Sequence, residues 1–112
     1  MRFVVPLALL LTCFTTASYA DQVLRATRYG NEHLGHRTAP GEMFNPGGMT
    51  AAHKLLAFGT CLLVGNPNTG KKVAVRVNDR GPFTPGVTLD LSSGATRAIR
   101  MRDTQNITMS RC

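Results

Sequence analysis

The chain has 112 residues, of which 13 are Lys or Arg and 6 are Asp or Glu, giving a formal net charge of +7. A chain of this length predicts one small domain and excludes a large multidomain enzyme. The positive charge favours a polyanionic partner. The basic residues are scattered, and there are few aromatic side chains that could stack on nucleic-acid bases. We therefore expect no nucleic-acid partner.

Residues 1–20 have the pattern of a secretory signal peptide. Arg2 precedes an apolar run from Phe3 to Phe14, and small residues ending at Ala20 fit a cleavage site. The apolar run is too short to span a bilayer, so we expect no stable membrane insertion. The mature protein would be periplasmic or extracellular, where anionic wall polymers are the simplest partner for a basic chain.

The cysteines predict a disulfide bond. Cys13 falls in the leader, and it lacks the small preceding residue expected of a lipidated cysteine. Cys61 and Cys112 remain as an even pair in an exported chain, so we expect them to be joined. Closing a loop of about fifty residues would stabilise the fold by about 4 kcal/mol on the chain-entropy model.

The first part of the mature chain predicts one strand and one long loop. Residues 23–29 alternate as a strand does, and residues 30–48 are rich in Gly, Asn, His and Pro without any period, as in a functional loop. Glu42 lies in this loop beside apolar neighbours. His33 and His36 lie there too, but no third ligand accompanies them, so we expect neither a metal nor a cofactor.

The middle of the chain predicts a series of short strands. Residues 49–53 begin a second strand, residues 54–59 lead to a third, and the apolar residues 61–64 suit a buried strand. Residues 65–70 carry the Gly, Asn and Pro of a hairpin turn.

The stretch from Lys72 to Asp90 is the most informative part of the sequence. Val73, Val75 and Val77 alternate with other residues, which predicts a half-buried strand. A polar turn containing Asp79 follows, and a further strand over residues 87–91 carries Asp90. Two carboxylates thus end strands on either side of one Gly/Pro-rich loop. They would be catalytic groups, or else a turn residue and a helix cap.

The end of the chain predicts a helix and a last strand. Ser92 suits the N-cap of a helix from Ser93 to about Met101, and residues 107–112 suit a strand. Some six short strands and one short helix predict a mainly β fold, a small closed barrel, because closure removes exposed edges.

Several blocks of residues together resemble a known family. They are Thr50-Ala51-Ala52-His53-Lys54, Phe58-Gly59-Thr60, Val77-Asn78-Asp79-Arg80-Gly81-Pro82-Phe83 and Leu89-Asp90-Leu91-Ser92, preceded in matching order by blocks at residues 26–30 and 37–44. Their joint occurrence resembles the rare lipoprotein A family of septal lytic transglycosylases. The resemblance implies a six-stranded double-psi β-barrel, related in architecture to expansins and family 45 glycoside hydrolases.

The resemblance also implies an activity. It is the endolytic cleavage of MurNAc–GlcNAc bonds in peptidoglycan glycan strands, with peptide-poor strands favoured, to give 1,6-anhydro ends. Family positions matching Glu42, His53 and Asp79 are tied to activity, and Asp90 matches an aspartate at the polysaccharide groove of expansins. Neither a lipid anchor nor the separate glycan-binding repeat domain common in the family is evident, so we expect a single monomeric barrel over residues 21–112.

Glycosidic chemistry suggests roles for these four residues. An acid must protonate the leaving oxygen while positive charge develops on the sugar. Asp79 is the first choice for this acid, which would also serve as the base, and Asp90 is its rival. Glu42 would stabilise the positive charge or orient the sugar. His53 would hydrogen-bond a carboxylate or the substrate, or else be buried and satisfied by backbone groups.

Four further residues are candidates for binding the glycan. Arg80 would fix a carboxylate or an acidic group of the substrate. Tyr29 and Phe83 would offer an apolar platform to a sugar ring, although either could equally be core. Thr50, in the first of the family-like blocks, is the fourth candidate.

Three other functions fit the same barrel. An expansin-like module would bind and loosen wall polysaccharide without cutting it. A plain hydrolase would leave reducing ends instead of anhydro sugars. A secreted effector or inhibitor would act on a host or rival cell. The trio Glu42, His53 and Asp79 favours the enzyme, because binding alone does not need it.

Overall fold

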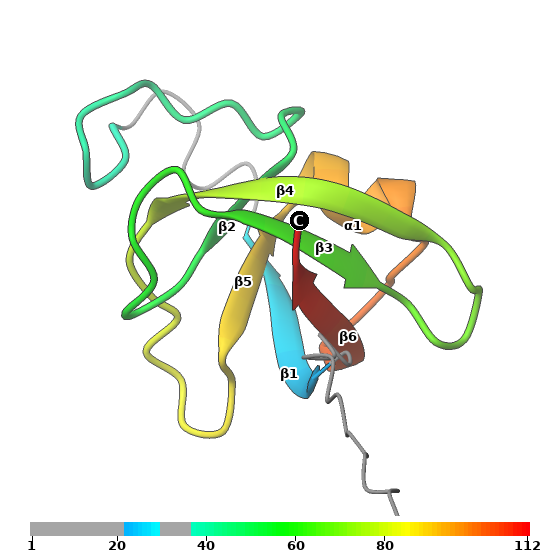
Figure 1. Ribbon diagram of the computed structural model, residues 1–112. Helices are drawn as coiled ribbons and strands as arrows, with labels where there is room; N and C mark the ends of the chain where they lie inside the picture. Colours follow the sequence, from blue (N-terminus) through cyan, green and yellow to red (C-terminus); the bar gives the residue numbers. More distant parts are fainter. Residues whose placement is uncertain (1–21, 30–36) are drawn as a thin grey trace, which may run out of the picture.

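The structure is a computed structural model, and it describes residues 22–29 and 37–112 (Figure 1). The elements in chain order are β1 (Gln22–Tyr29), β2 (Thr50–Ala52), β3 (Cys61–Gly65), β4 (Lys72–Asp79), β5 (Leu89–Ser92), α1 (Ser93–Ala98) and β6 (Gln105–Arg111). The six strands close into a barrel in the order β1-β5-β2-β4-β3-β6. The predicted mainly β fold, a closed six-stranded barrel with one short helix, is confirmed.

The strand order brings distant parts of the sequence together. β3 and β4 form an ordinary antiparallel hairpin, and β6 pairs antiparallel with both β3 and β1. β1 instead pairs parallel with β5, and β2 pairs parallel with β4. Because β5 also pairs with β2, the row β1-β5-β2-β4 forms one continuous side of the barrel.

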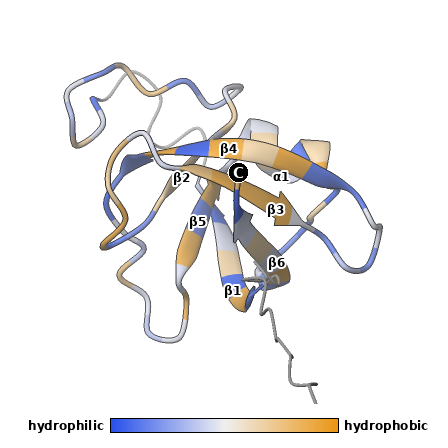
Figure 2. Ribbon diagram, in the orientation of Figure 1, coloured by the Kyte–Doolittle hydropathy of each residue, from blue (hydrophilic) through white to orange (hydrophobic). Residues whose placement is uncertain are grey.

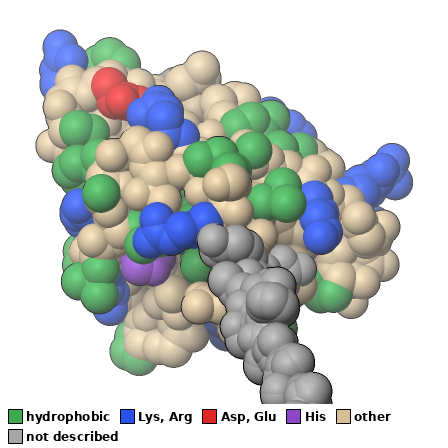
Figure 3. Space-filling model, in the orientation of Figure 1, with side chains coloured by type: hydrophobic (Ala, Val, Ile, Leu, Met, Phe, Trp, Pro, Cys, Tyr) green, Lys and Arg blue, Asp and Glu red, His purple; other side chains and the backbone are tan. Residues whose placement is uncertain are grey.

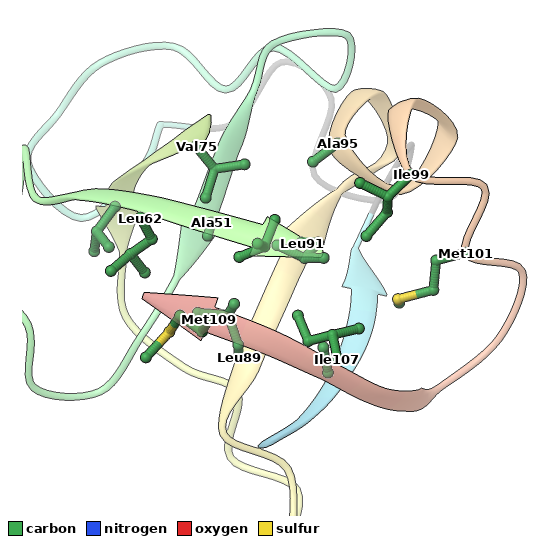
Figure 4. Packing of buried hydrophobic residues seen from close by; sticks show 13 residues of the cluster. Ala51, Leu62, Val75, Leu89, Leu91, Ala95, Ile99, Met101, Ile107 and Met109 are labelled. Carbon is green, nitrogen blue, oxygen red and sulfur yellow. The ribbon is translucent and has the colours of Figure 1, made fainter. Parts of the chain in front are cut away.

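Alternating side chains fill the barrel. Figure 2 shows apolar and polar residues alternating along the strands, as expected where one face is buried and the other is not. The inward side chains are fully buried, among them Leu62, Val64, Val77, Leu89, Leu91 and Ile107. Ala95 and Ile99, from α1 and its C-cap, join this cluster together with Met101 (Figure 4). Each large buried side chain contributes about 1.5–3 kcal/mol of transfer free energy.

Ser92 joins β5 to α1, as predicted for its N-cap. Its Oγ accepts hydrogen bonds from the backbone N–H groups of Ala95 (3.2 Å) and Thr50 (3.3 Å), and it donates to the carbonyl of Gly48 at 2.6 Å. One hydroxyl therefore ties the helix start, β2 and the preceding loop to the end of β5.

The helix is shorter than predicted. It ends at Ala98, although the sequence predicted a helix to about Met101. Arg100 has a positive φ of 57°, and the N–H of Met101 donates to the carbonyl of Thr96 at 2.8 Å. Such a left-handed cap stops a helix and turns the chain back.

Residues 54–59, predicted to lead into a strand, form turns and bends, and β3 begins only at Cys61. The N–H groups of Leu55 and Leu56 donate to the His53 side chain at 3.0 and 3.1 Å, so neither is available for a strand ladder. Side-chain capping of this kind replaces strand pairing with a turn.

The predicted disulfide between Cys61 and Cys112 is confirmed. The two Cα atoms are 5.3 Å apart and the cysteines are 51 positions apart in the sequence. The N–H of Cys112 also donates to the carbonyl of Cys61 at 3.1 Å, so the bond reinforces the seam between β3 and the end of β6. Within residues 22–29 and 37–112, no helix has the length and apolarity needed to cross a bilayer.

Candidate active site

A row of paired residues runs across four strands and carries both predicted aspartates. Thr27 of β1 pairs with Asp90 of β5, Asp90 pairs with Ala52 of β2, and Ala52 pairs with Asp79 of β4. Because neighbouring strands lie about 4.8 Å apart, the backbones of Asp79 and Asp90 are about 10 Å apart, with Ala52 between them. The fold therefore places the two carboxylates on either side of one small residue.

An irregularity in the register sets this row. Thr50 and Ala51 pair with Arg76 and Val77, and a shift between Ala51 and Ala52 then places Ala52 opposite Asp79. Bulges of this kind re-aim side chains at the rims of barrels.

The two aspartates have different surroundings. Asp90 is half-buried between the buried Leu89 and Leu91, and its Oδ1 accepts a hydrogen bond of 2.7 Å from Thr27 Oγ1. Asp79 Oδ1 accepts from two backbone N–H groups, those of Arg80 (2.9 Å) and Ala39 (3.0 Å). Within the described residues Asp79 Oδ2 accepts no hydrogen bond. Asp79 is thus held by one oxygen and presents the other.

Glu42 lies on the loop before β2, and its carboxylate is bound to β4. Arg76 donates to Oε1 at 3.0 Å and to Oε2 at 3.2 Å, and Asn78 Nδ2 donates to Oε1 at 3.0 Å. These hydrogen bonds, that of Arg76 foremost, hold the pKa of Glu42 below its usual value. Glu42 is therefore ionised at neutral pH and cannot supply a proton there.

Sequence reasoning missed Arg76 and Asn78. The alternation of β4 places both side chains on the outer face of the strand. This periodicity is the sequence feature that could have indicated that they lie near the site. Asn78 is 2% exposed, and its Oδ1 has no hydrogen-bond partner within the described part of the chain.

His53 follows β2 and is held as the neutral tautomer. Its Nδ1 accepts the N–H groups of Leu55 and Leu56, so the proton lies on Nε2. Burial, and then the positive charge of Arg80, lower the pKa of His53 below its usual value. His53 is satisfied by backbone groups on one side, and on the other it has an Nε2–H that can donate a hydrogen bond.

Arg80 has a different role from the predicted one. Its Nη1 donates to the carbonyls of Leu56 (2.6 Å) and His53 (3.1 Å), and its guanidinium lies 3.9 Å from the centroid of the Phe58 ring. Within the described residues no carboxylate pairs with this guanidinium. Arg80 therefore fixes the turn that carries His53.

Tyr29 and Thr50 lie near the two aspartates but are buried. Tyr29 is 3% exposed, its ring centroid lies 4.9 Å from that of Phe44, and its hydroxyl lies 3.4 Å from Thr50 Oγ1. Burial raises the pKa of Tyr29 to about 12 against the opposing hydrogen bond to Thr50, and the charges of Asp90, Asp79 and Glu42 add to the increase. Of the two alternatives for Tyr29, a sugar platform or a core residue, its burial favours the core.

Among the aromatic residues that the structure describes, Phe83 is the most exposed. It is 75% exposed, on the segment that follows Asp79, and Lys54 Nζ lies 5.7 Å from its ring centroid. The predicted histidine pair, His33 and His36, lies outside the described residues. Within those residues, no three side chains of His, Cys, Asp or Glu gather as metal ligands would. Lys and Arg side chains are spread over the face seen in Figure 3.

The closed barrel with its two parallel pairs is of the double-psi type, and solved structures share the fold. An expansin of Clavibacter michiganensis superposes with a TM-score of 0.62 at 24% identity, covering 82% of this chain and 50% of that one. Streptomyces papain inhibitor superposes with a TM-score of 0.63 at 19% identity, covering 80% of this chain and 94% of that one.

The family model for lytic transglycolases matches residues 21–110, so this chain belongs to that family, as its resemblance implied. The probable endolytic peptidoglycan transglycosylase RlpA of Synechocystis is 55% identical over 74 residues, which are 66% of this chain and 23% of the relative. The endolytic peptidoglycan transglycosylase RlpA of Yersinia pestis is 41% identical over 87 residues, 78% of this chain and 24% of the relative. The chain thus spans about a quarter of these relatives' length.

Proposed function

We propose that this barrel is a lytic transglycosylase that cleaves MurNAc–GlcNAc bonds within peptidoglycan glycan strands and leaves 1,6-anhydro ends. The observation that carries the proposal is the row Asp90–Ala52–Asp79, in which two half-buried carboxylates flank one small buried residue. Membership of the lytic transglycolase family supports it, and so do relatives named as endolytic peptidoglycan transglycosylases.

Asp79 is the proposed general acid and base. Backbone N–H groups hold its Oδ1, so Oδ2 can approach the glycosidic oxygen. The protonated carboxyl gives its proton to that oxygen as the C1–O bond breaks. The resulting carboxylate then takes the proton of the sugar's own 6-hydroxyl as that oxygen bonds to C1. No water is consumed, so one residue serves both half-reactions.

Asp90 and His53 have supporting roles in this mechanism. Asp90 places a negative charge across the row, where it stabilises the positive charge that develops at C1 and the ring oxygen. His53 donates its Nε2–H to a sugar oxygen. Phe83 is the proposed platform for a sugar ring.

The proposed substrate implies the compartment in which the protein acts. A basic, exported monomer meets peptidoglycan in the periplasm or outside the cell, and peptide-poor strands give it the readiest access to the sugar. The net charge of +7 favours retention on an anionic wall.

The test is digestion of intact and of peptide-stripped peptidoglycan by the purified protein, with soluble products read by mass spectrometry. We expect anhydro-ended fragments, and we expect Asp79→Asn to abolish them. Asp103→Asn is the matched control, because Asp103 is exposed in the segment between α1 and β6. Reducing-end products would replace the transglycosylase with a hydrolase. Binding to the wall without any soluble product would replace it with an expansin-like binding module.

A further inference from the structure

Residues 37–43 form a compact hairpin ahead of β2. Arg37 and Met43 form an antiparallel bridge, and the N–H of Thr38 donates to the carbonyl of Glu42 at 2.8 Å. The tip closes through the N–H of Gly41, which donates to the carbonyl of Thr38 at 2.8 Å. Gly41 has a φ of +96°, which favours glycine. These contacts join residues 37–43 into one compact unit.

Two polar attachments join this hairpin to β4. The first is the N–H of Ala39, which donates to Asp79 Oδ1 at 3.0 Å. The second is the carboxylate of Glu42, which receives both nitrogens of the Arg76 fork and the amide of Asn78. Each pair of attachment points is three residues apart, on the hairpin and on the strand. The ion pair therefore sets where the Ala39 N–H lies.

The ion pair is suited to holding a position. A bidentate Arg–carboxylate pair fixes both distance and orientation. The Arg76 and Glu42 side chains are 50% and 40% exposed, so the pair adds little to global stability. Because both side chains are partly exposed, the desolvation cost of the ion pair is small, while its bidentate geometry is specific.

We infer that Glu42 and Arg76 are positioning residues, whose ion pair places the Ala39 N–H on Asp79 Oδ1 and so orients Oδ2 toward the glycan. This inference rests on the function proposed for Asp79, and it replaces the catalytic role expected of Glu42. Both Glu42 oxygens accept hydrogen bonds from β4, and in this inference the carboxylate acts through the hairpin.

Reversal of the two charges tests the inference. Glu42→Arg and Arg76→Glu should each lower kcat by up to about 10²-fold, the loss that a misplacement near 1 Å can cause, with a smaller change in KM. The double variant E42R/R76E should recover most of kcat, because the pair forms again with its ends exchanged. Asn78 can turn its amide so that the unpartnered Oδ1 accepts from the new arginine.

Arg97→Glu is the matched control, since it makes the same charge change as Arg76→Glu at an exposed position of α1 and should leave kcat unchanged. An E42R/R76E protein as inactive as Glu42→Arg would overturn the inference, because Glu42 itself would then be required. An Arg76→Glu protein with wild-type kcat would overturn it as well.

Amide hydrogen exchange gives a readout that does not depend on activity. The Ala39 amide should be protected in the wild type, exposed in each single reversal and protected again in the double variant. If the wild type makes no anhydro products, the proposed function fails while this pattern still tests the positioning role. Equal protection of the Ala39 amide in all four proteins would show that the ion pair does not hold the hairpin.

Discussion

Ala52 is the strand neighbour of both aspartates, since it pairs with Asp90 on one side and with Asp79 on the other. It is 4% exposed and packs with Tyr29 and Phe44. The methyl group of Ala52 therefore lies between the two carboxylates, as the floor of the site, and belongs to a small cluster with two aromatic rings.

A larger residue at this position should damage both stability and activity. Ala52→Val adds two methyl groups against Tyr29 and Phe44, and we expect a loss of about 1–3 kcal/mol in the free energy of unfolding. Urea titration measures it. Ala57→Val, at an exposed position, should change stability by less than about 0.5 kcal/mol. If Ala52→Val were as stable as the wild type, two more methyl groups would fit beside Tyr29 and Phe44, and the tight packing inferred for Ala52 would be wrong.

Gly94 allows the closest approach of two backbones beside the site. A Cβ there would lie 2.4 Å from the carbonyl oxygen of Gly47 and 3.0 Å from that of Gly48. Gly94→Ala should therefore displace the segment leading into β2 and lower the melting temperature by several degrees, at a cost of about 1–3 kcal/mol. At Gly47 an added Cβ meets only an ordinary contact of 3.5 Å, so Gly47→Ala should be nearly neutral. Similar melting temperatures for both variants would contradict this packing.

His53 should make the fold sensitive to acid. Its pKa is lowered in the folded protein, so the unfolded chain takes up the proton first as the pH falls. The stability that neutral His53 contributes is present above its ordinary pKa of about 6.5 and is lost as the pH falls through the lower folded value. Urea midpoints for wild type and His53→Asn should therefore converge on acidification. A constant difference between them from pH 8 to pH 4 would rule this out.

Loss of the disulfide should destabilise the barrel without changing its site. The bond closes a loop of 51 positions, so the C61A/C112A double variant should lose up to about 4 kcal/mol in the free energy of unfolding. Intact mass before and after reduction would establish the bond, through a gain of two hydrogens. An unchanged urea midpoint in the double variant would mean that the seam is held by strand pairing alone.

Removal of the Phe83 ring should weaken substrate binding and spare the fold. The side chain is 75% exposed, so Phe83→Ala should leave the urea midpoint within error of the wild type. If the ring carries a sugar, KM for glycan strands should rise several-fold, with kcat less affected. Leu55→Ala, at 84% exposure, is the control for loss of exposed apolar surface. An unchanged KM in the Phe83→Ala variant would show that the Phe83 ring does not bind a sugar.

Two simple features of the sequence predicted parts of the structure. The alternation of Val73, Val75 and Val77 predicted β4, and the parity of Cys61 and Cys112 predicted the disulfide. What could not be predicted is the register and direction in which distant strands pair. The register shift after Ala51 and the parallel pairing of β1 with β5 leave no trace in periodicity, and they are what bring the site together.

Contacts with distant residues also decide the surroundings of three predicted site residues. Tyr29 carries no local sign that the loop residue Phe44 will pack against its ring. Arg80 has the charge of a substrate-binding residue, and its Nη1 donates to two backbone carbonyls. Glu42 was predicted as a site residue, but its partner Arg76 lies 34 positions away and could not be identified from spacing.

Ser92, which joins β5 directly to α1, gives the two aspartates unequal freedom. Asp90 lies two residues before this junction, and three hydrogen bonds of the Ser92 hydroxyl bind the junction to its surroundings. Asp79 instead stands at the head of the surface segment that carries Phe83. The Asp90 side of the site is therefore fixed to the scaffold, whereas Asp79 leads into a segment whose length can vary at little cost. Related barrels could thus acquire new glycan preferences by insertions after Asp79, without rebuilding the side that carries Asp90.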